Sequence, residues 1–169
     1  HAAAKQLIAA HALPLAPAHN PDGNVELARE LLDWAVRKQD EQSVDAFAKV
    51  AGIDAEDAFG RTALDVAVIG GSASLVRHLL AAGAKAAHAD HFGVTPLMLA
   101  AEGESTAILD AILRSNREVD AKDQAGNTAL AYAARVGRID QVNRLLAAGA
   151  GVEGENSDGW TVLDTAAKT

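Results

Sequence analysis

The sequence predicts an all-α fold in which short helix-turn-helix units stack side by side into a solenoid. The first observation is a 33-residue period, at which glycine, threonine, leucine and alanine return to equivalent positions. These residues are Gly60, Gly93, Gly126 and Gly159; Thr62, Thr95, Thr128 and Thr161; Leu64, Leu97, Leu130 and Leu163; and Ala67, Ala100, Ala133 and Ala166. The second observation is that the apolar residues between these landmarks follow the helical period of about 3.6 residues. The third is that self-similarity at a constant spacing of roughly 20 to 50 residues is the signature of a stacked repeat array.

The composition is that of a folded chain, and it argues against several classes of function. Hydrophobic residues make up 49% of the 169 residues, which is enough to bury a core. The net charge of −8, with no isolated cluster of Lys or Arg, argues against nucleic acid as a partner. No run of about 18 consecutive apolar residues is present, so no membrane span is predicted.

The chain contains no cysteine, which excludes disulfides, thiolate nucleophiles and thiolate-bound zinc. This absence does not fix the compartment. The chain begins with His1 rather than methionine, which is typical of a processed or engineered start. A cytoplasmic location is slightly favoured, with the periplasm or secretion after removal of a leader as alternatives. The alanine-rich composition suits a bacterial protein.

Residues 1–22 are expected to form an N-terminal helix followed by a loop. High helix propensity predicts the helix over residues 2–12, and the prolines at positions 14 and 17 end it. Residues 20–23 are typical of a turn, after which Asn24 is expected to cap a helix that runs to about Lys38. A second helix follows, and its apolar stripe consists of Val44, Phe47, Ala48 and Val50. Residues 23–56 are therefore predicted to be a degenerate capping repeat.

Three full units follow, at residues 57–89, 90–122 and 123–155, and a partial unit covers residues 156–169. In each unit a turn with glycine leads to a threonine whose hydroxyl is expected to cap the first helix. The first helix carries small residues that let neighbouring helices approach closely. The second helix is predicted to supply most of the core, through Leu75, Val76, Leu79 and Leu80, then Ile108, Leu109, Ile112 and Leu113, then Ile139, Val142, Leu145 and Leu146. Gly83, Asn116 and Gly149 stand just past the second helices, where a left-handed backbone is expected.

The opening phrase of the second full unit, Gly93-Val94-Thr95-Pro96-Leu97-Met98, resembles the Gly-x-Thr-Pro-Leu-His phrase of the ankyrin repeat family. Looser copies begin at Gly60, Gly126 and Gly159. Every copy lacks the family's histidine, which predicts weaker hydrogen bonding between neighbouring turns. The resemblance implies an ankyrin-repeat solenoid with a non-enzymatic role. Such an array is expected to bind another protein, as an adaptor or inhibitor, through its concave face and turn tips.

The residues that vary within this framework are the candidates for contact with a partner protein, because turns and packing occupy the framework positions. The partner-binding candidates are Phe59, Arg61, Ile69, His91, Phe92, Val94, Glu102, Gln124, Asn127, Arg135 and Trp160. Aromatic residues are favoured at binding hot spots. Two interpretations of the three aromatic candidates stay open: they contact a partner, or they fold back against their own turns. The charged candidates either touch a partner or belong to a solvated face.

Three alternatives compete with the protein-binding role. A structural spacer within a longer array is suggested by the fourth unit, which ends before its second helix. A metal-binding protein would use His88 and His91, which flank Asp90, although that acid also repeats the residue that opens each turn. An enzyme is disfavoured because the sequence has no phosphate-binding loop, His-Glu-x-x-His or Gly-x-Ser-x-Gly motif. We therefore expect a monomer with no catalytic residue, metal or cofactor.

Overall fold

The protein is a row of helix pairs, and the computed structural model describes residues 21–167 of it. Within that range the chain forms helices, turns and loops, with no strand. The helices are α2 (Pro21–Arg37), α3 (Glu41–Ala51), α4 (Ala63–Ile69), α5 (Ala73–Ala81), α6 (Pro96–Glu102), α7 (Thr106–Ser115), α8 (Ala129–Arg135), α9 (Ile139–Ala147) and α10 (Val162–Ala167). They confirm the predicted all-α solenoid. The helix predicted over residues 2–12 lies outside the described residues.

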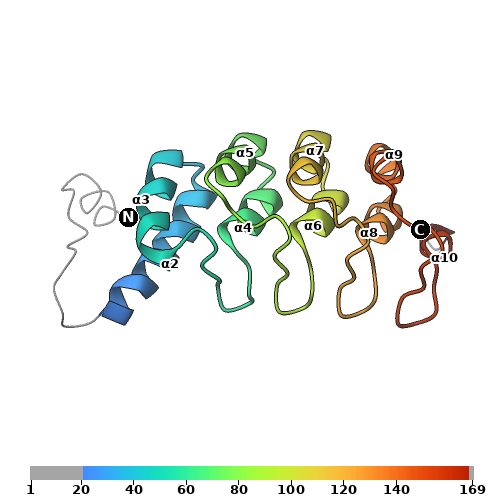
Figure 1. The fold of residues 1–169 in the computed structure, drawn as a ribbon, viewed down its shortest axis with the longest axis horizontal. Coiled ribbons are helices and arrows are strands. Elements are labelled where there is room, and N and C mark those ends of the chain that lie inside the picture. The colour runs from blue at the N-terminus through green and yellow to red at the C-terminus, as the bar shows by residue number, and fades with distance from the viewer. Residues whose placement is uncertain (1–20, 168–169) are drawn as a thin grey trace.

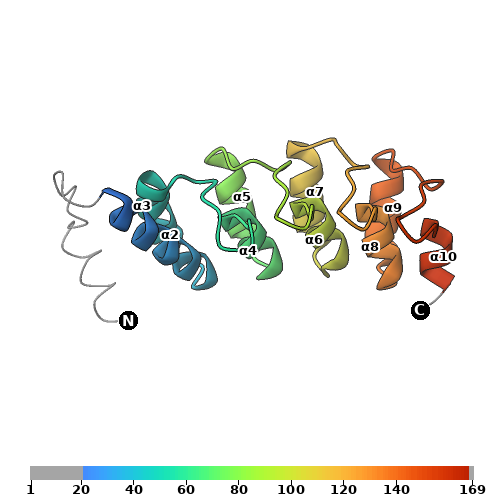
Figure 2. The same ribbon diagram turned by 90° about the horizontal axis from the view of Figure 1, so that it is seen from below.

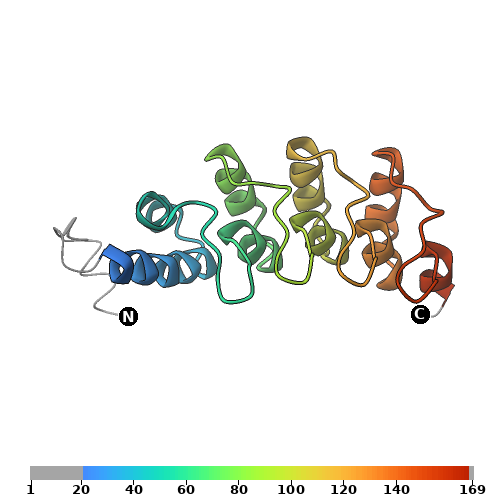
Figure 3. The same cartoon turned by 60° about the horizontal axis from the view of Figure 1, so that its bottom comes forward.

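The helices of the repeats form two layers, and the turns project from one side of the row. In Figure 1 the first helices α4, α6 and α8 lie in one line, and the second helices α5, α7 and α9 lie in another line above them. The loops that precede the first helices all extend in the opposite direction, and Figure 3 brings them forward. Each first helix packs against its own second helix and against the first helix of the next unit. This stacking creates one continuous edge of turns along the array.

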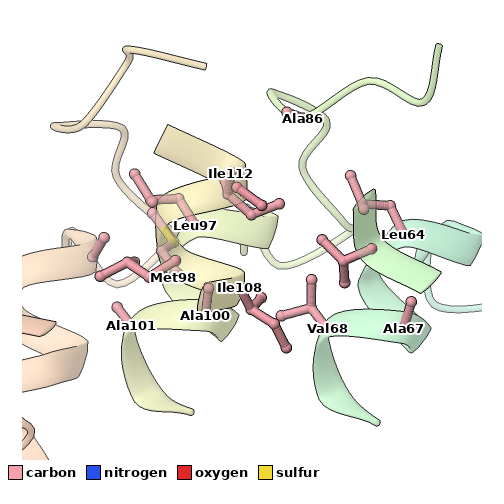
Figure 4. Close-up of a cluster of buried hydrophobic side chains, with 14 of the residues drawn as sticks. Leu64, Ala67, Val68, Ala86, Leu97, Met98, Ala100, Ala101, Ile108 and Ile112 are labelled. Carbon is pink, nitrogen blue, oxygen red and sulfur yellow. The ribbon is translucent and has the colours of Figure 1, made fainter. Parts of the chain in front are cut away.

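A continuous apolar core runs between the two layers. Leu64, Leu97 and Leu130 occupy the same position in three consecutive units, and they are 0%, 1% and 1% exposed. Figure 4 shows Leu97 of α6 together with Ile112 of α7 and the small side chain of Ala100 in this core. Burial of a large aliphatic side chain stabilises a fold by about 1.5–3 kcal/mol, so this column of leucines contributes strongly to the cohesion of the array.

Threonine side chains begin the first helices, as predicted, with one variation. The hydroxyls of Thr95 and Thr128 each accept a hydrogen bond from the backbone N–H three residues later, at 3.4 Å in both cases. In the preceding unit Thr62 and Asp65 form a capping box, in which the carboxylate of Asp65 reaches back to Thr62. It accepts hydrogen bonds from the backbone N–H of Thr62 at 2.8 Å and from its hydroxyl at 2.9 Å. These bonds satisfy N–H groups that have no partner within the helix.

The opening helix pair begins earlier than the sequence predicts. The turn at residues 20–23 and the cap at Asn24 are wrong, because α2 starts at Pro21 and Asn24 lies inside it. Proline is favoured at the first helical position, where its missing N–H leaves no intrahelical hydrogen bond unmade. The second predicted helix is confirmed as α3, in which Val44 and Phe47 are buried.

The ends of the second helices follow the prediction at two of three positions. Gly83 and Gly149 have left-handed backbones, with φ of 98° and 96°. The same prediction for Asn116 is wrong, because its φ is −137°. The side-chain oxygen of Asn116 accepts the N–H of Glu118 at 3.0 Å, and this local bond holds the chain in an extended turn.

Two predicted core residues of α9 are exposed to solvent. Ile139 is 72% exposed and Leu146 is 41% exposed, although Leu145 on the same helix is fully buried. Apolar periodicity indicates which face of a helix packs against the core. Residues at the edges of that face are buried only where a neighbouring helix lies beside them. Among the described residues no second helix follows α9 in the row, so the residues on its outer edge stay uncovered.

Candidate partner-binding surface

An aspartate at the start of the turn in each of the three full units fixes the turn that follows it. One carboxylate oxygen of Asp57 accepts the N–H groups of Phe59 at 2.8 Å and Arg61 at 2.9 Å. Asp90 repeats this arrangement one unit later and accepts the N–H groups of Phe92 at 2.8 Å and of the residue at position 94 at 2.9 Å. Short polar side chains commonly stabilise turns in this way. Both phenylalanines are therefore held at the tips of well-defined turns.

Neighbouring turns are joined to one another through their backbones. The carbonyl of Phe59 accepts the N–H of His91 at 3.0 Å, and the carbonyl of Phe92 accepts the N–H of Gln124 at 2.9 Å. The carbonyl of Ala125 accepts the N–H of Ser157 at 2.8 Å and extends the series. Although the expected histidine is missing from the repeat phrase, the turns are thus connected by one backbone hydrogen bond at each step. The net contribution of one such hydrogen bond to the stability of the fold is about 0.5–1.5 kcal/mol.

The two aromatic side chains at the first two tips are open to solvent. Phe59 is 54% exposed and Phe92 is 58% exposed. The guanidinium carbon of Arg61 lies 5.0 Å from the centre of the Phe59 ring, a cation–π contact. The same guanidinium pairs with Asp57, at 2.6 Å between Nη2 and Oδ2. Although desolvation opposes it, hydrogen bonding from Arg61 lowers the pKa of Asp57.

Ile69 lies on the same part of the molecule, at the end of α4, and is also exposed. Ile69 and Arg61 line one hollow of about 190 Å³, together with Val36, Arg37 and Gln39 from the opening helix pair. We call Phe59, Arg61, Ile69 and Phe92 the turn-tip surface. The contributions of Arg37 and Gln39 were not predicted, because the opening pair has no glycine or threonine landmark that aligns it with the other units.

Glu102 and Arg135 are at the position of Ile69 in the next two units, and they pair with each other. Oε1 of Glu102 lies 3.0 Å from Nη2 of Arg135. The guanidinium carbon of Arg135 is also 4.9 Å from the centre of the Tyr132 ring. The Tyr132 hydroxyl donates a hydrogen bond to Asp123 at 2.9 Å, and burial together with this bond raises the pKa of Tyr132. Tyr132 was not a predicted contact residue, although its place one helical turn before Arg135 could have indicated it.

The remaining candidates have roles inside the row of turns. Val94 is half-buried and packs against the core. The Gln124 amide donates a hydrogen bond to the carbonyl of His91 at 2.7 Å, which supports the backbone bond between these turns. Asn127 bonds to the turn acid before it and accepts a hydrogen bond from Asn156 at 3.0 Å. Trp160 is half-buried at the far end of the row.

The histidines considered as metal ligands point to other partners. Nε2 of His88 lies 2.8 Å from the carbonyl of Gly60, within hydrogen-bonding distance. Nε2 of His91 lies 4.0 Å from Oε2 of Glu56. Over the described range, no three histidine, aspartate or glutamate side chains are arranged to hold a metal ion. Asp90 is engaged in its own turn, as the repeat pattern predicts.

Two acids that repeat three residues after the helix-capping threonine are also explained by structure. Asp65 and Asp164 each accept two hydrogen bonds from that threonine. Burial raises the pKa of Asp65. Hydrogen bonds from Thr161 lower the pKa of Asp164, which is exposed. The pKa values of the two carboxylates are therefore shifted in opposite directions, although both accept hydrogen bonds from the threonine at the start of their helix.

Comparison with known families identifies the repeat. A family model described as ankyrin repeats (3 copies) matches residues 22–123 and again residues 97–169. A search of curated protein sequences finds no match. In the part of the chain with a described structure, every helix is too short or too polar to span a lipid bilayer.

Proposed function

Because this chain belongs to the ankyrin repeat family, whose members are generally protein–protein interaction modules, we propose that it binds a protein partner through the turn-tip surface. The partner also contacts the adjoining concave face of the first helices. In this role the chain is a non-enzymatic adaptor or inhibitor. It acts by occupying or recruiting the partner, and no bond in the partner is made or broken.

The observation that supports this proposal most is the exposure of two aromatic rings on turns that are already ordered. Phe59 and Phe92 are more than half exposed, while the backbone around them is held by the turn acids and by the bonds between turns. Ordering a flexible loop on binding costs free energy, and a preformed turn avoids most of that cost. Aromatic side chains provide a large contact area, and they are enriched among residues that dominate binding energy.

The charges near the turn-tip surface favour a contact that is mainly apolar. Arg61 already pairs with Asp57, and Glu102 already pairs with Arg135. Exposed ion pairs of this kind contribute only about 0–1 kcal/mol, and a partner would have to compete with them to use the charges. The partner is therefore expected to bury Phe59, Ile69 and Phe92, with polar groups at the rim of the contact.

A comparative capture experiment tests the proposal. The wild-type chain and the double variant Phe59→Ala/Phe92→Ala are immobilised, and captured proteins are quantified by mass spectrometry. Ile139→Ala is the matched control, because Ile139 is an exposed apolar residue on a second helix. Proteins that bind the wild type and the control, and are depleted several-fold on the double variant, support the proposal. Equal capture by all three chains would refute the claim that the partner binds the turn-tip surface. It would favour the alternative role of a structural spacer.

A further inference from the structure

Two successive junctions between repeat units are built differently. Figure 2 shows the helix pairs α4/α5, α6/α7 and α8/α9 in order along the row, so the first junction lies between the first two pairs and the second junction between the last two. At the second junction two polar side chains from the start of α9 reach back to the loop that follows α6. At the first junction the equivalent positions, 33 residues earlier, carry different residues beside a hollow.

Arg138 and Gln141 close the second junction. Nε of Arg138 donates a hydrogen bond to the carbonyl of Glu102 at 3.2 Å, and its Nη2 lies 3.2 Å from Oε1 of Glu104. The buried side-chain amide of Gln141 donates a hydrogen bond to the carbonyl of Gly103 at 2.7 Å. The last carbonyls of a helix have no partner within it, so the end of α6 obtains donors from the next unit.

The first junction lacks these donors. Ser105 stands where Arg138 stands one unit later, and Ile108 stands in place of Gln141. The hydroxyl of Ser105 accepts the backbone N–H of Ile108 at 3.4 Å and so caps α7. An isoleucine side chain has no polar group that could donate. Neither side chain therefore supplies a donor to the loop that follows α4.

A hollow of about 410 Å³ lies at the first junction, and we call it the junction hollow. Its apolar lining includes Val68 and Ile69 from the end of α4, Ala100 of α6 and Ile108 of α7. Figure 4 shows Val68 and Ile108 facing each other, with Ala100 beside them. The lining also includes the acid Glu104, whose side chain is 85% exposed. The junction hollow thus combines an apolar interior with an accessible carboxylate.

This combination suits a long side chain that is apolar along its stem and cationic at its end. The stem would pack against Val68 and Ile108, and the charged end would meet Glu104 and the carbonyl of Ile69. Arginine suits the site better than lysine, because its planar guanidinium presents five N–H donors that can reach a carbonyl and a carboxylate together. Arg138 makes this pair of contacts at the second junction.

We infer that the protein partner inserts an arginine side chain into the junction hollow, in the way that Arg138 enters the second junction. Its guanidinium donates a hydrogen bond to the carbonyl of Ile69 and pairs with Glu104. The inference rests on the proposed function, because Ile69 also belongs to the turn-tip surface, and it names the side chain that the partner presents beside its apolar contact. A partner without this arginine would bury the carbonyl without a donor, which disfavours its binding.

The test uses a displayed library of random short peptides as the probe. Peptides that bind the wild-type chain are enriched, and those that also bind Ser105→Arg are removed. This variant copies Arg138 at the equivalent position, so the chain's own guanidinium is expected to occupy the junction hollow. Ser105→Ala is the matched control, because it loses the same helix cap and leaves the hollow open. The remaining peptides are synthesised with a fluorescent label, and binding to the whole chain is measured by fluorescence anisotropy.

We expect the remaining peptides to share an arginine, and its replacement by lysine or alanine to weaken binding by roughly tenfold or more. Ser105→Ala is expected to bind within about twofold of the wild type. Glu104→Gln, which leaves the helix cap intact, is expected to weaken binding by roughly threefold or more. Far-UV circular dichroism verifies that the variants are folded. We expect Ser105→Arg to fold, because Arg138 begins α9 without a side-chain cap bond.

Four results would overturn the inference. No peptide remains after the removal step, or the remaining peptides bind equally well without arginine. Alternatively, a folded Ser105→Ala loses binding as Ser105→Arg does, or Glu104→Gln binds as tightly as the wild type.

Failure of the inference is distinguishable from failure of the proposed function. The double variant Phe59→Ala/Phe92→Ala tests the proposed function, and neither phenylalanine lines the junction hollow. Depleted capture on that variant, together with a failed peptide test, would reject the arginine contact and retain the turn-tip surface. Equal capture, together with arginine-dependent peptides, would reject the turn-tip surface and retain the arginine site.

Discussion

The contact between neighbouring turns gives a sharp test of how this array is held together. Gly93 and Gly159 occupy the same position in two turns, with φ of 78° and 76°. A Cβ added to Gly93 would lie 3.0 Å from the backbone nitrogen of Gln124 and 3.1 Å from Cα of Asp123. At Gly159 nothing lies within 4 Å of the added atom. The two glycines therefore share a conformation but differ in the presence of a neighbour.

The expected cost of each substitution follows from this difference. A left-handed alanine costs about 1–2 kcal/mol, and reduced freedom of the unfolded chain returns about 0.4–1 kcal/mol. Gly159→Ala is thus expected to lower the free energy of unfolding by roughly 0–1.6 kcal/mol. In Gly93→Ala the backbone contact adds overpacking of about 1–3 kcal/mol. The total is therefore about 1–5 kcal/mol, and strain in the Phe92–Gln124 hydrogen bond raises it further.

Urea denaturation followed by far-UV circular dichroism measures both free energies of unfolding. Gly83→Ala is a second control, inside the array, because Gly83 also has a positive φ and nothing within 4 Å of an added Cβ. We expect Gly93→Ala to be clearly less stable than either control. Equal losses in the three variants would show that packing between turns contributes little to stability, which contradicts the role assigned to this contact.

Three further predictions concern single side chains. Leu130→Ala is expected to lower the free energy of unfolding by about 2–5 kcal/mol in chemical denaturation. Leu163→Ala, at the equivalent but exposed position, is expected to lower it by about 0.5 kcal/mol or less. Equal losses would contradict the difference in burial between the two leucines. Because burial raises the pKa of Asp65, its stabilising contribution is complete below the unfolded pKa of about 3.9 and is lost as pH rises through the folded value. Asp65→Asn is therefore expected to gain stability relative to wild type as pH increases from about 3 to 7 in urea titrations, and a constant difference would refute this. Arg144→Ala removes an exposed ion pair with Asp110 and is expected to cost about 0–1 kcal/mol, with the cost shrinking at high salt; a salt-independent loss would contradict a charge effect.

The sequence predicts the repeat architecture well because each landmark acts locally. A threonine such as Thr95 caps the helix that follows it, and an acid such as Asp90 folds the turn around itself. Neither interaction requires knowledge of a distant residue. A period that repeats these local signals therefore predicts the order of turns and helices, and the family match supports the same interpretation.

Interactions between elements were harder to predict. The apolar pattern of α9 marks Ile139 and Leu146 as core residues, but their burial depends on a neighbouring helix beside α9. The pattern of one helix carries no information about that neighbour. The pairing of Glu102 with Arg135 is likewise a contact between successive units. It could have been found, because the two residues are 33 positions apart and opposite in charge.

The prediction of where α2 starts was wrong for a different reason. Pro21 belongs to a short segment that is compatible with both a turn and a helix start, and local propensity does not separate the two. Lacking the repeat landmarks, the opening pair offered no second signal. Its contribution to the hollow next to Ile69 therefore became apparent only with the helices in place.

Site-specific photo-crosslinking tests the central claim, that a protein partner lies on the turn-tip surface, most directly. A photoreactive phenylalanine analogue is placed at position 92 in one chain and at position 139 in another, because both native side chains are exposed. The chains are irradiated in a cell extract, and crosslinked proteins are identified by mass spectrometry. The account predicts a discrete protein adduct from position 92 that position 139 does not form. No adduct from position 92, or the same adducts from both positions, would contradict it.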